Sequence, residues 1–116
     1  LQPDQDGFFW LKVDDFRNAV APDASAEETA LMAAAQKPIA ARCLVEPMTQ
    51  PAWKEKPSWF LIANNDIMVS PDTQRFTAQR MKSKVVSLPV DHSPLRSQPK
   101  AVADLISDAA AHLDVF

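Results

Sequence analysis

Glycine is almost absent from this chain. Gly7 is the single glycine among 116 residues, where average usage of about 7% would give roughly eight. Phosphate-cradling loops and nucleophile-presenting turns need glycine, because they use positive φ angles or a close approach of the backbone. A P-loop, a Rossmann fingerprint and a glycine-flanked nucleophile elbow are therefore excluded within these residues. Ten prolines, about twice the usual ~5%, divide the chain into short segments.

Size and charge exclude several classes of protein. The 116 residues suffice for one domain at most. With 12 Lys and Arg against 15 Asp and Glu, the net charge is −3, so there is no basic field for nucleic acid. No apolar run approaches the roughly 18 to 20 residues that cross a bilayer, so we expect no membrane-spanning segment. The single cysteine, Cys43, excludes an intrachain disulfide and is expected to be a buried small hydrophobe.

The first half of the chain reads as short and mainly helical segments. Ser25 and Glu28 form a capping-box pattern, which predicts the start of a helix. The expected elements are a strand at 7–13, a helix at 26–36, helical character at 39–45 and a proline-rich linker at 47–57.

The second half reads as strand, loop, helix, strand, loop, helix. The expected elements are a nearly continuous apolar strand at 58–63, a helix at 72–81 capped by Ser70, a strand at 84–90, a polar loop at 91–98 and an amphipathic helix from Pro99 whose apolar face is Val102, Leu105, Ile106, Ala109 and Leu113. This order predicts two parallel strands with both following loops at the same, C-terminal edge of the sheet. Open α/β sheets bind their ligands at that edge.

The two polar loops carry the most suggestive pair of side chains. Asp66 follows the first of these strands and His92 follows the second. Neighbouring parallel strands lie about 4.8 Å apart, so side chains just past their ends can meet. A carboxylate that accepts the imidazole Nδ1–H fixes its tautomer and leaves the other ring nitrogen free to act as a general base. On spacing alone, two solvated side chains remain the alternative interpretation.

These segments resemble the C-terminal part of α/β-hydrolase-fold esterases. The resemblance lies in Lys56 to Asp66, Ser70-Pro71, Gln74-Arg75-Phe76, Ala78 to Met81, Asp91 to Pro94, Ser97-Gln98-Pro99 and Val102 to Ile106. The upstream part of the chain resembles the cap region that covers the substrate pocket in these esterases. The matching residues are Asp6-Gly7, Phe16, Ala33 to Pro38 and Ala52-Trp53.

The resemblance implies an α/β fold class: the C-terminal portion of an α/β-hydrolase fold, with two parallel strands, flanking helices and a mainly helical cap segment. It implies a cap-like segment at 1–50 and hydrolase core at 51–116. Asp66 and His92 match the triad acid and the triad histidine, and Trp53 and Trp59 are candidates for lining the substrate pocket. The basic residue that usually follows the acid in this family is replaced here by Ile67.

The family also needs a glycine-rich oxyanion loop and a Gly-x-Ser-x-Gly elbow, and the chain contains neither. We therefore expect a portion of a serine hydrolase that supplies acid and base for a small ester or acyl substrate, is inactive alone and uses no cofactor. The start at Leu1 fits a fragment. The serines that could replace the nucleophile are expected to have structural roles; they are Ser58, Ser70, Ser93 and Ser97.

Two other interpretations stay open. One is a non-catalytic binding or assembly module of the same fold, since two strands leave open edges that favour self-association or pairing with a missing N-terminal half. A metal site on Asp66 and His92 is weaker, because a third ligand at suitable spacing is missing. We expect a soluble chain, and the sequence does not distinguish the cytoplasm from the periplasm.

Overall fold

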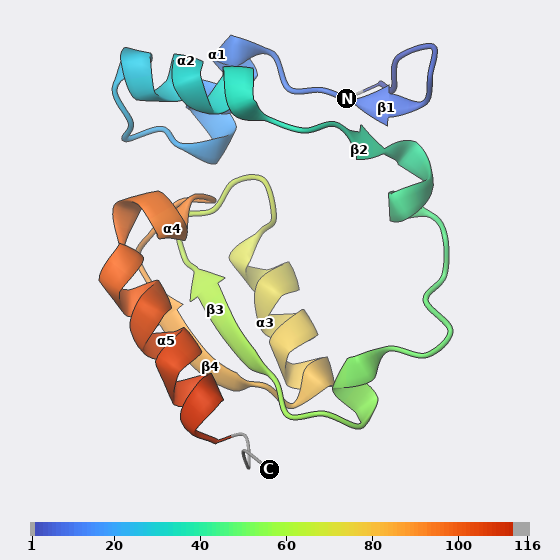
Figure 1. The fold of residues 1–116 in the computed structure, drawn as a ribbon, viewed down its shortest axis with the longest axis vertical. Helices are drawn as coiled ribbons and strands as arrows, with labels where there is room; N and C mark the ends of the chain where they lie inside the picture. Colours follow the sequence, from blue (N-terminus) through green and yellow to red (C-terminus); the bar gives the residue numbers. More distant parts are fainter. Residues whose placement is uncertain (1, 113–116) are drawn as a thin grey trace. The chain divides into compact units, whose positions relative to one another are not determined.

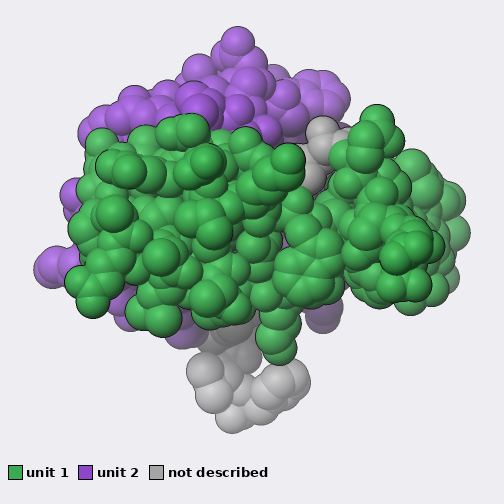
Figure 2. Space-filling view, turned by 90° about the horizontal axis from the view of Figure 1, so that it is seen from above, with its two compact units in different colours: residues 1–51 green, residues 52–116 purple. Residues whose placement is uncertain are grey.

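The chain forms two compact units, residues 1–51 and 52–116 (Figure 2). The computed structural model describes residues 2–112. The division between the units falls one residue after the boundary expected from the sequence. No helix in the described range is long and apolar enough to cross a bilayer.

Unit 1 (residues 1–51) is built from short elements around a small apolar core. They are β1 (Phe8–Phe9), α1 (Val13–Asp15), a π-helical turn (Phe16–Val20), α2 (Ala26–Ala35), β2 (Ile39–Ala40) and a 3-10 turn (Ala41–Leu44). Phe16, Val20 and Ala33 form the buried cluster, and Leu11 and Met32 pack against it.

One local signal in the first half acts as expected, and Gly7 takes a conformation that suits glycine. The predicted capping box opens α2: the Ser25 hydroxyl accepts from the Glu28 amide at 3.1 Å, and the Glu28 carboxylate accepts from the Ser25 amide at 2.8 Å. Gly7 has a φ of 82°, a left-handed conformation that suits a residue without Cβ. Its carbonyl accepts the Ala41 amide at 2.8 Å, so the turn joins β1 to the segment after β2.

Three expectations for unit 1 are wrong. The strand expected at 7–13 shrinks to Phe8–Phe9, because only these residues find a partner: β2, which pairs antiparallel with β1. Helical character was expected over 39–45, but Ile39–Ala40 is extended and only the following four residues coil. Cys43 is exposed rather than buried, since this 3-10 turn has no buried residue.

Unit 2 (residues 52–116) is an α/β unit. Its elements are a 3-10 turn (Ala52–Lys54), β3 (Trp59–Ala63), α3 (Pro71–Met81), β4 (Lys84–Leu88), α4 (Pro94–Ser97) and α5 (Pro99–Ala111). Helices α3 and α5 flank the strand pair, and both contact β3 (Figure 1). The fold class predicted from the sequence, two parallel strands with flanking helices and a mainly helical N-terminal segment, is confirmed.

The strand register sets the edge of the sheet where chemistry can occur. Strands β3 and β4 are parallel, with Trp59 opposite Lys84 and Ala63 opposite Leu88. Their carboxyl ends therefore lie at one edge (Figure 1). Two further backbone bonds extend the pairing into the loops, from the Asn64 amide to the Leu88 carbonyl at 2.8 Å and from the Asn65 amide to the Val90 carbonyl at 3.0 Å.

Two helices of unit 2 begin where the sequence predicts: α3 directly after its cap Ser70, and α5 at Pro99. Ser70 Oγ accepts from the Thr73 amide at 3.2 Å, and Pro71 occupies the first turn of α3. The loop expected at 91–98 contains the short helix α4, which begins at Pro94. On α5, Ile106 of the predicted apolar face is 62% exposed. Leu113, the last member of that face, lies outside the described residues.

Candidate active site

Asp66 and His92 meet at the carboxyl edge of the β3–β4 sheet. His92 Nδ1 lies 2.8 Å from Asp66 Oδ2. Each side chain stands in the loop that follows its strand, and the backbone bonds between the two loops bring them side by side. The structure thus brings together the two residues that the sequence singled out.

The Asp66 carboxylate is held at both oxygens. Oδ1 accepts the backbone N–H groups of Met68 at 2.8 Å and Val69 at 3.0 Å. Oδ2 accepts the side-chain amide of Gln74 at 2.9 Å, besides the imidazole of His92. Four donors converge on one carboxyl group, so its orientation is fixed.

Burial and hydrogen bonding act in opposite directions on this carboxyl group. The Asp66 side chain is 4% exposed, and burial raises the pKa of a carboxyl group. The hydrogen bond from His92 outweighs this with help from the Val69 and Met68 amides, and the net effect holds the pKa of Asp66 below its usual value. Asp66 is therefore a carboxylate near neutral pH.

The charge of Asp66 determines the tautomer of its partner. A carboxylate offers only acceptors, so the proton of the 2.8 Å bond resides on His92 Nδ1. In the neutral ring, Nε2 then carries a lone pair. The His92 side chain is 37% exposed. The imidazole is therefore accessible to solvent, and Nε2 can accept a proton.

The loop that carries His92 is braced by a buried carboxylate. Asp91 Oδ1 accepts both the amide of Ser93 at 2.9 Å and its hydroxyl at 2.7 Å. Asp91 Oδ2 lies 3.4 Å from the Arg96 guanidinium, which α4 provides. The sequence pattern predicts a polar loop here and misses α4. The pair Ser93-Pro94, which is typical of a helix start, is the signal that indicates this helix.

The local serines have other partners. Ser93 Oγ donates to Asp91, Ser70 caps α3, Ser58 bonds to the Ser83 hydroxyl at 2.8 Å, and Ser97 donates to the Ser93 carbonyl at 3.3 Å. Within residues 2–112, no serine hydroxyl is hydrogen-bonded to His92.

The two tryptophans predicted to line the pocket lie away from this pair. Trp59 begins β3, about 13 Å along the strand from Ala63 at ~3.3 Å per residue. Its indole N–H donates to Asp108 at 2.6 Å. Trp53 lies under the guanidinium of Arg80, in the last turn of α3. The structure brings neither ring to the edge where Asp66 and His92 meet.

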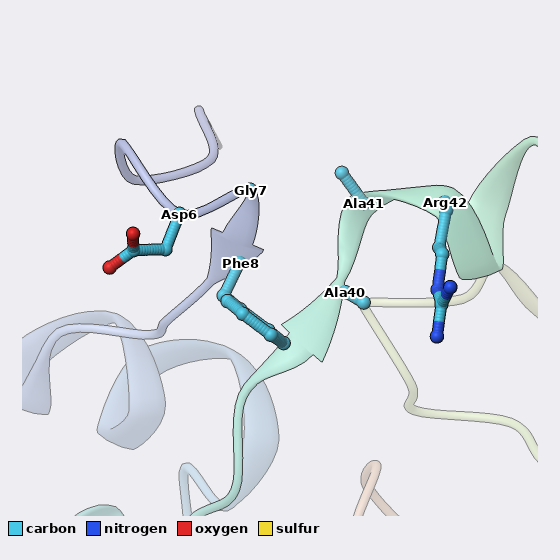
Figure 3. A pocket seen from close by; sticks show the side chains of 6 residues that line it. All are labelled: Asp6, Gly7, Phe8, Ala40, Ala41 and Arg42. Carbon is cyan, nitrogen blue, oxygen red and sulfur yellow. The ribbon is translucent and has the colours of Figure 1, made fainter.

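Unit 1 carries a hollow of its own. Its volume is about 430 Å³, and it is lined by Asp6, Gly7, Phe8, Ala40, Ala41 and Arg42. Figure 3 shows the Asp6 carboxylate and the Arg42 guanidinium pointing in different directions, so the two charges do not converge on one point. The other four lining residues are glycine, alanine and phenylalanine, so the hollow holds no catalytic pair.

A metal site finds no support beyond the first two side chains. Over the described range, 2–112, no three His, Cys, Asp or Glu side chains gather as a metal cluster. The structure therefore adds no third ligand to Asp66 and His92.

The architecture is that of an α/β protein with a bonded aspartate–histidine pair at the carboxyl edge of a parallel sheet. The sequence matches the family model described as alpha/beta hydrolase family over residues 2–105. The chain belongs to the alpha/beta hydrolase family. No curated protein and no solved structure matches it.

Proposed function

We propose that this chain supplies the acid and the base of a serine-hydrolase triad that cleaves small carboxylic esters. Asp66 is the triad acid and His92 the general base, and the nucleophilic serine lies outside these 116 residues. The observation that supports the proposal is the 2.8 Å hydrogen bond between His92 Nδ1 and the Asp66 carboxylate, which is buried and accepts four hydrogen bonds in all. Family membership supports the fold in which such a pair acts.

The proposed chemistry follows from that bond. A serine hydroxyl attacks the ester carbonyl while His92 Nε2 takes its proton, and Asp66 stabilises the imidazolium that forms. The imidazolium then returns the proton to the departing alkoxide, which leaves as the alcohol. The acyl group stays on the serine as an ester. Water then attacks this ester while His92 Nε2 takes its proton, and the proton passes to the serine oxygen as the acyl–oxygen bond breaks and the carboxylic acid leaves. This sequence needs no cofactor.

The partner of the chain follows from the same proposal. Among the described residues β3 pairs only with β4, so its outer edge can take up a strand from the segment that carries the nucleophile or from a second copy. The role of residues 1–50 as a cap is inferred from the resemblance. The alternative function, a non-catalytic assembly module, relies on the same edge but not on the Asp66–His92 bond.

Two measurements test the proposal. The purified 116-residue chain should not hydrolyse p-nitrophenyl acetate above background. The encoding frame, if it extends upstream into a Gly-x-Ser-x-Gly segment, should yield a longer chain that does, and His92→Gln should lower its kcat by about 10³-fold or more. His112→Gln is the matched control, since His112 lies on the last turn of the described chain and its Nδ1 bonds the Asp108 carbonyl.

Robust turnover by the 116-residue chain that a serine-directed phosphonate abolishes would contradict the missing nucleophile. A longer, active chain whose rate survives His92→Gln would contradict the role of His92. A longer chain without activity that still binds its partner strand would favour the assembly module.

A further inference from the structure

Gln74 is a buried glutamine whose side chain is fully engaged. It lies on the first half of α3 and is 6% exposed. Its Oε1 accepts the Ala63 amide at 2.9 Å. Its Nε2 donates to Asp66 Oδ2 at 2.9 Å and to the Val69 carbonyl at 2.8 Å. One side chain thus contacts the end of β3, the carboxylate and the loop between β3 and α3.

The bond to Ala63 reaches the outer edge of the sheet. The Lys84 amide bonds the Ser58 carbonyl and the Asn64 amide bonds the Leu88 carbonyl. Backbone groups in a parallel pair alternate in direction along each strand. Even-numbered residues of β3 therefore face β4, and the Ala63 N–H faces away from it. Gln74 satisfies that N–H and thereby fixes the strand end from which the Asp66 loop departs.

The bond to Asp66 limits how the carboxylate can turn. Two backbone amides occupy Oδ1, so a rotation that withdraws Oδ2 from His92 breaks those bonds and the one from Gln74 together. With one position on Oδ2 taken by Gln74, the remaining acceptor direction points to His92 Nδ1. The family's usual basic residue after the acid is Ile67 here, which is 70% exposed.

We propose that Gln74 is the positioning residue of the aspartate–histidine pair: its side-chain amide fixes the Asp66 carboxylate in the orientation that holds His92 as the Nδ1–H tautomer. This inference rests on the proposed function of that pair. It assigns Gln74 no contact with substrate. A glutamine that only joined α3 to β3 would stabilise the fold without setting the histidine tautomer.

The tautomer of His92 separates these two roles. Long-range ¹H–¹⁵N NMR measures the fraction of Nδ1–H in the labelled chain, at a pH well above the ordinary histidine pKa of about 6.5. Asp66→Asn sets the baseline, because the asparagine NH2 group, in the place of Oδ2, donates to the ring nitrogen and favours the other tautomer. Gln74→Met keeps length and removes the amide. Gln79→Met, on the exposed side of the same helix, is the matched control.

We expect a clear excess of Nδ1–H over the Asp66→Asn baseline in the unaltered chain, an excess that Gln79→Met preserves and Gln74→Met at least halves. A Gln74→Met chain with the full excess would overturn the positioning role while leaving the proposed function intact. An unaltered chain at the Asp66→Asn baseline would overturn the proposed function as well.

A second measurement needs no substitution, so a misfolded variant cannot obscure the answer. Both protons of Gln74 Nε2 are bonded, and they should exchange with water far more slowly than those of exposed Gln79 in the same molecule. Equal exchange rates at the two glutamines would refute the proposal.

Discussion

His92 Nδ1 and Asp66 Oδ2 lie 2.8 Å apart although 26 residues separate them in the chain. The contact is a consequence of topology: two parallel strands in register end at one edge, and each residue lies in the loop that follows its strand. The Asp66 carboxylate is buried, whereas the His92 imidazole is partly exposed to solvent. This asymmetry keeps the acid away from water and leaves the base accessible.

Acid should remove part of the stability of unit 2 through Asp66. Its pKa in the folded chain lies below the usual value, since the His92, Val69 and Met68 bonds outweigh burial. A carboxyl group with a lowered folded-state pKa stabilises the fold above its unfolded-state pKa of about 3.9, and this contribution is lost as the pH falls through the folded-state value. Urea unfolding between neutral pH and that region, followed by β3 amide resonances, should show the loss.

Asp66→Asn should lower stability at neutral pH and flatten this acid branch. Asp23→Asn, which alters an exposed carboxylate in unit 1, should leave the branch unchanged. An acid branch that persists undiminished in Asp66→Asn would contradict the assignment.

Local signals in the sequence sufficed to predict the two strands and the two longer helices of unit 2. The apolar run of β3 and the Ser70-Pro71 start of α3 are each contained in a few adjacent residues. Once the strands are parallel, Asp66 and His92 lie at the same edge, which allows the hydrogen bond that the structure shows between them. The same reasoning failed for β1 and β2, because two-residue strands exist only through their long-range pairing.

Side-chain roles were harder to predict than backbone elements. Gln74 and Ala78 are four residues apart and are the buried residues of α3. That spacing marks an inward face, but a helix pattern does not say that a glutamine there reaches a carboxylate. Trp59 shows a second difficulty: its aromatic type suggests a pocket-lining residue, but the sequence does not reveal that it begins β3, at the end of the strand opposite Asp66.

Removal of the Asp91 carboxylate should destabilise unit 2. Its oxygens accept two bonds from Ser93 and pair with Arg96, whose side chain is 25% exposed. Asp91→Ala leaves these donors without an acceptor, so the free energy of unfolding should fall by about 2 kcal/mol. Asp104→Ala is the control, because its partner Lys100 and the carboxylate itself are exposed, and its effect should stay within about 0.5 kcal/mol. Equal losses in the two variants would contradict the bracing role.

Trp59 should respond to Asp108 rather than to the proposed active site. The Lys84 ammonium and the Trp59 indole N–H both donate hydrogen bonds to the Asp108 carboxylate. These bonds, with that of Lys84 the stronger influence, hold the pKa of Asp108 below its usual value. Asp108→Asn should therefore change Trp59 fluorescence near neutral pH, because the indole N–H loses a charged acceptor. His92→Gln should leave that fluorescence unchanged. If Trp59 fluorescence changed in His92→Gln but not in Asp108→Asn, the result would favour Trp59 as a residue of the substrate pocket.

Self-association of the chain should use the outer edge of β3. The N–H groups of Trp59 and Leu61 face away from β4, by the same alternation that exposes the Ala63 amide to Gln74. Strand β3 is apolar along its length, whereas β4 carries Lys84 and Ser87. An apolar open edge is the one that recruits another strand.

Proline substitutions distinguish the two edges, since proline removes an outward N–H without breaking the β3–β4 ladder. Leu61→Pro should shift the sedimentation profile toward the 12.8 kDa monomer. Val85→Pro is the matched change, because the Val85 N–H faces outward from β4 by the same alternation, and it should leave association unchanged. Circular dichroism establishes that both variants remain folded. A purely monomeric unaltered chain would refute self-association, and a monomer produced only by Val85→Pro would assign it to β4 instead.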